Sequence, residues 1–118
     1  MAILFRKTRR HRGPERRHHR MFLTRNSEYH CRDGTCVAVR DLVTGKFRHD
    51  HPAIGRHMTG GIRFALDGSV QSITQCGEEP HVGESLFFSN GKLDEELRTS
   101  ALRTITRPPA VALREYTL

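Results

Sequence analysis

After Met21, the apolar residues come in runs of four to six, and Asp-Gly, Thr-Gly or Asn-Gly pairs lie between these runs. Such pairs readily adopt the positive φ angles that tight β-turns require, and they are the strongest short-range signals for hairpins. Runs of this length suit strands better than helices. The sequence therefore predicts a mainly β fold in which short antiparallel strands are joined by tight turns.

The clearest hairpin joins residues 28–31 to residues 36–40 through a turn at Asp33-Gly34. A second reversal at residues 43–46 would return the chain through Phe47. Together these segments predict a three-stranded meander over residues 27–49.

Later segments predict further strands. A hairpin that turns at Asp67-Gly68 alternates apolar and polar residues, and we expect the Gly60-Gly61 pair to end the loop before it. Residues 85–89 predict a short buried strand, and residues 99–106 predict a final strand that Pro108-Pro109 stops.

With 118 residues the chain has room for one domain. We expect a small single-domain barrel or a strongly curved antiparallel sheet of about six strands, preceded by a flexible basic N-terminal arm. The predicted division is residues 1–20 for the arm, 21–107 for the β domain and 108–118 for a C-terminal tail.

The net charge of +7 lies in the predicted arm. Residues 6–20 hold eight of the 20 Lys and Arg and one acidic residue, whereas the rest of the chain carries twelve of each sign. A concentrated cationic segment on a neutral body is typical of a chain that meets an anionic partner, and nucleic acid is the partner we favour. The candidate polyanion-binding residues are Arg6, Lys7, Arg9, Arg10, Arg12, Arg16, Arg17 and Arg20.

Two other partners fit the same pattern. The chain could be an adaptor or structural subunit of a protein assembly, held through apolar patches on the body. Apolar residues also flank the basic run at 1–5 and 21–23, which is a pattern for lying on an anionic membrane surface. No run approaches the 18 or so apolar residues that a spanning helix needs. Without an export signal, we expect a cytoplasmic protein.

Three cysteines, Cys31, Cys36 and Cys76, raise the question of a metal. The predicted hairpin places Cys31 opposite Cys36, where the two thiols could pair if oxidised or form half of a zinc site with Cys76. The spacing lacks a second C-x2-C or H-x3-H unit, so we expect small buried side chains instead. No oxyanion hole or phosphate-binding loop is evident, and we expect a binding module without a cofactor instead of an enzyme.

Two short stretches resemble PilZ-type domains, which are small β-barrels that bind cyclic dinucleotides. Arg16 and Arg20 have the Arg-x-x-x-Arg spacing of that family, and residues 58–62 resemble its second motif, with His57 in place of the acidic or amide residue and Thr59 in place of Ser. The resemblance implies a regulatory domain in which the two arginines clamp phosphates.

Overall fold

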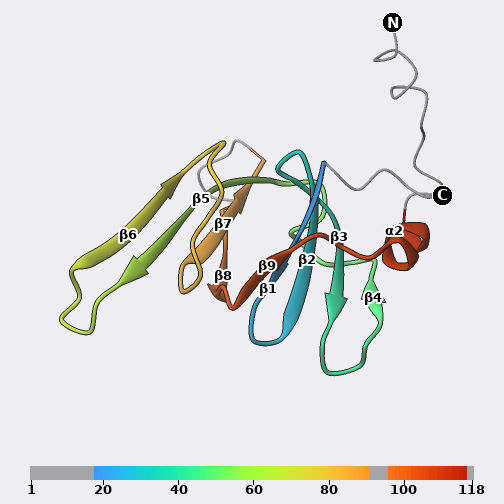
Figure 1. The fold of residues 1–118 in the computed structure, drawn as a ribbon, viewed down its shortest axis with the longest axis horizontal. Coiled ribbons are helices and arrows are strands. Elements are labelled where there is room, and N and C mark those ends of the chain that lie inside the picture. The colour runs from blue at the N-terminus through green and yellow to red at the C-terminus, as the bar shows by residue number, and fades with distance from the viewer. Residues whose placement is uncertain (1–17, 91–95, 117–118) are drawn as a thin grey trace, which may run out of the picture.

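The structure is a computed structural model that describes residues 18–90 and 96–116. Within these residues, nine strands form one antiparallel sheet and the chain ends in a short helix (Figure 1). The strands are β1 (His19–Leu23), β2 (Ser27–Arg32), β3 (Thr35–Asp41), β4 (Phe47–Arg48), β5 (His57–Phe64), β6 (Val70–Gln75), β7 (Ser85–Ser89), β8 (Leu97–Ala101) and β9 (Thr104–Thr106). The prediction of a mainly β fold is thus confirmed.

The main path of the sheet runs in the order β8-β7-β5-β3-β2-β1-β9, while β4 pairs with β3 and β6 pairs with β5. Its two end strands, β8 and β9, are neighbours in sequence but do not pair with each other, so the described sheet is open. The barrel alternative was therefore wrong, and nine strands replace the expected six or so.

The predicted strand at residues 99–106 is divided because the backbone changes partner at Leu102. The N–H of Leu102 donates to the carbonyl of Glu84 at 2.7 Å, and the N–H of Arg103 donates to the carbonyl of Leu23 at 2.7 Å. The side chain of Leu102 enters the core at this point. One chain segment therefore supplies both ends of the sheet, β8 and β9.

The first predicted hairpin is confirmed. Asp33 has a φ of 50° and Gly34 a φ of 87°, as a two-residue turn with positive φ at both positions requires. Strand β4 pairs with β3 after the second predicted reversal, which completes the meander.

The Gly60-Gly61 pair does not end a loop, because it lies inside β5. A Cβ atom at Gly60 would come within 2.8 Å of the Thr74 carbonyl, and one at Gly61 within 2.8 Å of the Glu84 carboxylate. The glycines are therefore needed for the close approach of β6 and of Glu84, which sequence analysis did not anticipate.

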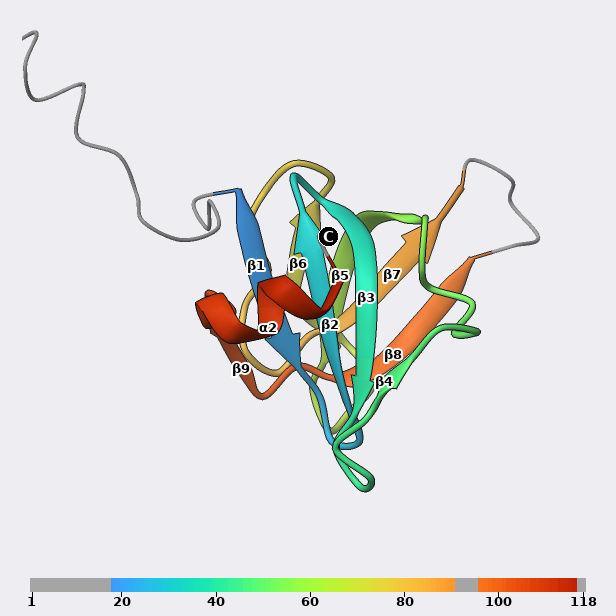
Figure 2. The ribbon, with the colours of Figure 1, turned by 90° about the vertical axis from the view of Figure 1, so that its right-hand side faces the viewer.

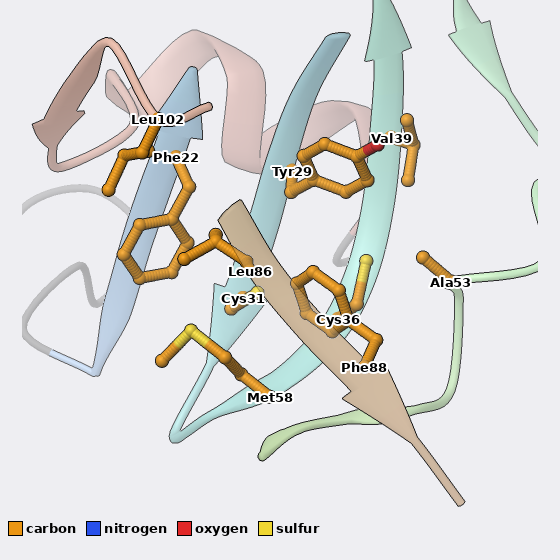
Figure 3. Packing of buried hydrophobic residues seen from close by; sticks show 10 residues of the cluster. All are labelled: Phe22, Tyr29, Cys31, Cys36, Val39, Ala53, Met58, Leu86, Phe88 and Leu102. Atoms are coloured by element: carbon orange, nitrogen blue, oxygen red, sulfur yellow. The ribbon is translucent and has the colours of Figure 1, made fainter. Parts of the chain in front are cut away.

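One face of the sheet holds the apolar core. Figure 3 shows its residues converging from β1, β2, β3, β5 and β7, with the rings of Tyr29 and Phe88 stacked at a centroid distance of 5.5 Å. The core residues are Phe22, Tyr29, Cys31, Cys36, Val39, Ala53, Met58, Leu86, Phe88 and Leu102.

The opposite face of β1 and β2 is covered by helix α2 (Ala110–Tyr116), which crosses these strands in Figure 2. The helix follows Pro108-Pro109, and the carbonyl of Pro109 accepts hydrogen bonds from the N–H groups of Ala112 and Leu113. It therefore lies within the stretch predicted as a tail. Strand β1 likewise begins at His19, inside the stretch predicted as the arm, whose residues 1–17 lie outside the described part of the chain.

Candidate functional site

A pocket of about 400 Å³ opens where β5 changes neighbours, and we call it the fork pocket. His57 of β5 pairs with Thr35 of β3, but three residues later Gly60 pairs with Gln75 of β6. Strands β3 and β6 therefore diverge from the same side of β5. The walls of the fork pocket come from β1, β2, the turn at residues 33–34, the start of β5 and the loop of residues 76–80.

Charged groups of both signs line the fork pocket. The guanidinium Nε of Arg20 donates to Oε1 of Glu79 at 3.1 Å, and Nδ1 of His18 lies 3.0 Å from Oδ1 of Asp33. These pairs are partly exposed, so water screens them and each contributes little to stability. An anionic ligand would therefore compete with Glu79 for Arg20 at a modest cost.

Only one of the eight candidate polyanion-binding residues, Arg20, belongs to the described part of the chain. The other seven, from Arg6 to Arg17, lie outside it. Arg20 is held on β1 by the ion pair with Glu79 and by a hydrogen bond from its Nη1 to the His19 carbonyl at 3.0 Å. The segment of residues 6–20 thus joins the body at the wall of the fork pocket.

Described residues from both PilZ-like stretches line the fork pocket. Arg20 is the last residue of the first stretch. His57 directly precedes the second stretch, and Met58 is its first residue. All three residues line the fork pocket. Thr59, which stands in place of the family's Ser, points elsewhere, because its hydroxyl donates to the Phe87 carbonyl at 3.4 Å.

The three cysteines are free, and two of them are buried. Cys31 lies in the wall of the fork pocket, beside Cys36 in the register of β2 and β3 (Figure 3). The backbone N–H of Cys36 donates to the Arg56 carbonyl, and its carbonyl accepts from Gly55 N–H. Because the backbone of Cys36 is directed away from Cys31, the two form a non-hydrogen-bonded pair, the arrangement in which cross-strand Cα atoms come closest.

We therefore expect Cys31 and Cys36 to form a disulfide when the protein is treated with an excess of a low-molecular-weight disulfide. A non-hydrogen-bonded pair has a Cα separation of about 4.5 Å, which a disulfide can bridge without backbone movement. A hydrogen bond to Cys36 and burial raise the pKa of the Cys31 thiol, so the reaction should be slow. Mass spectrometry after proteolysis should show the 31–36 cross-link in native protein and in Cys76→Ser, but none in Cys36→Ser. A cross-link to Cys76 instead would contradict this geometry.

A metal site is not assembled around these thiols in the part of the chain that the structure describes. Among residues 18–90 and 96–116, no three His, Cys, Asp or Glu side chains lie close enough to hold a metal ion. The metal candidates Cys31, Cys36 and Cys76 thus gain no further ligand among these residues.

A second charged cluster, which sequence analysis missed, lies on the face of the sheet covered by α2. The carboxylate of Glu28 accepts hydrogen bonds from Nε of Arg40 at 2.8 Å and from its Nη2, and it lies 3.2 Å from Nε2 of the buried His30. Burial lowers the pKa of His30, although the nearby Glu28 carboxylate acts to raise it. Burial acts to raise the pKa of Glu28, but its interactions with Arg40 and His30 outweigh burial and lower that pKa. The cluster is a structural ion pair between the buried Glu28 and the partly exposed Arg40, beside the buried imidazole of His30.

A third cluster surrounds the fully buried carboxylate of Glu84. It accepts hydrogen bonds from the hydroxyls of Ser72 and Thr74 and from the backbone N–H of His81. The residue types suggest a catalytic triad, but Nδ1 of His81 lies 3.3 Å from the carboxylate and 3.5 Å from the Ser72 hydroxyl. A triad needs the acid and the nucleophile on opposite ring nitrogens. This cluster therefore links β6 to the loop before β7 and offers no activated nucleophile.

Among the described residues, no helix is long and apolar enough to cross a membrane. No protein family, no curated protein and no solved structure matches this chain.

Proposed function

We propose that this chain is a non-enzymatic binding module that contacts nucleic acid through the cationic segment of residues 6–20. The observation that carries the proposal is the separation of charge, because this segment accounts for the whole net charge of +7. Phosphate contacts by Lys and Arg supply most of the affinity of sequence-independent nucleic-acid binding.

The body supports this role by anchoring the segment. Arg20 is part of β1, and Phe22 two residues later is buried in the core. Because the last cation of the segment is fixed to the sheet, a bound polyanion would be held beside the fork pocket. The acidic side chains of Glu78 and Glu79 at its rim would disfavour phosphates on that side of the pocket and so direct the polyanion along the segment.

Direct binding tests the proposal. Fluorescence anisotropy should show that the full chain binds both a mixed-sequence RNA and a DNA duplex at low salt, with little preference for sequence. The absence of binding to both polymers at low salt would overturn it.

A second function, binding of a cyclic dinucleotide, is favoured by one specific observation. Arg20, His57 and Met58 come from the two PilZ-like stretches, and they line one pocket of about 400 Å³. That volume lies within the range of small-molecule sites. A guanidinium at the wall suits a ligand phosphate, and Glu79 would have to release Arg20 when the ligand binds.

This second function predicts a selective pattern of losses in calorimetric titrations with cyclic dinucleotides. Arg16→Ala and Arg20→Ala should each lower the affinity at least tenfold, because each removes a charge-assisted phosphate contact. The matched variants Arg6→Ala and Arg9→Ala should leave the affinity within about twofold, since they lie outside the Arg-x-x-x-Arg spacing. Equal losses in all four variants would exclude a specific pocket and favour the polyanion.

A further inference from the structure

Strand β6 (Val70–Gln75) is an edge strand of the described sheet. In the described part of the chain it pairs with β5 alone, and Figure 1 shows the β5–β6 hairpin extending beyond the other strands. Its sequence, VQSITQ, contains no charged residue and no proline. Natural edge strands normally carry such residues to prevent pairing with another chain.

The other three edge strands of the described sheet differ from β6. Strand β4 pairs with β3 alone, has two residues and carries the charge of Arg48. Strand β8 carries the charge of Arg98, and β9 has three residues and lies between Arg103 and Arg107. Charge and short length are two of the features that protect edges. Among the described edges, β6 is therefore the one whose backbone groups are open to a further strand without charge repulsion.

The outer face of the β5–β6 hairpin is also apolar. Ile73 of β6 is 57% exposed and lies opposite Ile62 of β5, while Phe64 is 47% exposed. The guanidinium of Arg98 lies 5.8 Å from the centre of the Phe64 ring and 5.9 Å from that of Phe87. The inner face is occupied, because Ser72 and Thr74 donate to the buried Glu84. Apolar side chains exposed beside an open edge indicate that another strand covers this edge.

We propose that β6 pairs antiparallel with β6 of a second copy of this chain. Strand pairing about a two-fold axis perpendicular to the sheet keeps the same face of both copies on one side, so Ile73 of each copy would lie on the outer side of the seam. An uncharged strand is complementary to itself, because no like charges meet when it faces its own copy. The projecting hairpin allows two bodies to approach through β6 alone. This dimer is independent of the proposed nucleic-acid binding.

Sedimentation velocity of the full chain tests the proposal in the absence of nucleic acid. From low to high micromolar concentration, the mass should rise from 13.5 kDa toward twice that value. Ile73→Lys places charges at the seam and should weaken association at least tenfold. Val111→Lys, which replaces a similarly exposed apolar residue on α2, should associate as the native chain does.

Circular dichroism would establish that both variants are folded, as expected for exposed positions. A monomer at every concentration, or undiminished association of Ile73→Lys, would overturn the β6 dimer. Equal loss of association in Val111→Lys would also overturn it, since the interface would then include α2.

Discussion

Replacing Glu84 with Gln should lower the free energy of unfolding by about 3 kcal/mol near neutral pH. The carboxylate is completely buried and accepts hydrogen bonds from Ser72, Thr74 and the His81 backbone. The side-chain amide of Gln carries hydrogen-bond donors, whereas the groups around the Glu84 carboxylate all donate to it. Hydrogen bonds to a charged group would therefore be lost, and at least one buried donor would lack an acceptor. Urea denaturation of the two proteins measures the difference.

The same carboxylate should make stability depend on acid pH. Burial alone would raise the pKa of Glu84, but the hydrogen bonds from His81, Ser72 and Thr74 outweigh it and lower the pKa from 4.5 to about 2. A group whose pKa is lower in the folded state stabilises the fold above its unfolded pKa. This contribution, about 3 kcal/mol, should therefore be complete above pH 4.5 and disappear as the pH falls toward 2.

Glu84→Gln should lack this part of the pH dependence, whereas Glu96→Gln, a change at an exposed carboxylate, should keep both the stability and the pH profile of the native chain. If Glu84→Gln were as stable as the native chain at neutral pH, the buried carboxylate would not hold β6 against the loop before β7.

Removing residues 1–17 should reduce the affinity for RNA and duplex DNA at least 100-fold at low salt. The deletion removes seven of the eight cations of the segment together with Glu15, and the net charge falls from +7 to +1. The shortened chain should begin at His18, because His19 and Arg20 are part of β1 and their loss would disturb the sheet. Fluorescence anisotropy with the same labelled polymers measures the change.

A matched control removes charge from the body instead. Arg103, Arg107 and Arg114 are exposed, and a chain in which all three are replaced by Gln should keep its affinity within about tenfold. If this control lost as much affinity as the deletion, the polyanion would bind across the body and the segment would have no special role.

The local fold could be predicted from the sequence wherever a turn requires a particular residue type. Asp33-Gly34 and Asp67-Gly68 mark the two hairpins because each turn needs a residue that tolerates positive φ. Those signals act over a few residues, so they hold without knowledge of the rest of the chain.

Features that depend on distant contacts could not be predicted in this way. In the sequence, the Gly60-Gly61 pair indicates a loop. Its place inside β5 depends on the close packing of Thr74 and Glu84 against the two glycines. The division between β8 and β9 follows from the change of backbone partner at Leu102, which joins residues far apart in sequence. The same holds for α2, since its short apolar run after two prolines becomes a helix where Leu113 is buried.

The candidate site was predicted in part. Charge alone made Arg20 and the cations before it candidates, and Arg20 lies at the wall of the fork pocket. The hairpin register correctly placed Cys31 opposite Cys36. The fork pocket was not foreseen, because it exists only where β3 and β6 diverge from β5. The buried carboxylates of Glu28 and Glu84 were also missed, because nothing in their local sequence distinguishes them from exposed acids.

A salt titration of nucleic-acid binding tests the central claim most directly. The logarithm of the binding constant of the full chain for duplex DNA should fall linearly with the logarithm of the salt concentration. With four to eight phosphates neutralised by residues 6–20, the slope should lie between about −4 and −7. A chain that begins at His18 should have a slope near −1 or no measurable binding. A slope shallower than about −2 for the full chain, or equal slopes for both chains, would contradict the assignment of residues 6–20 as the polyanion-binding segment.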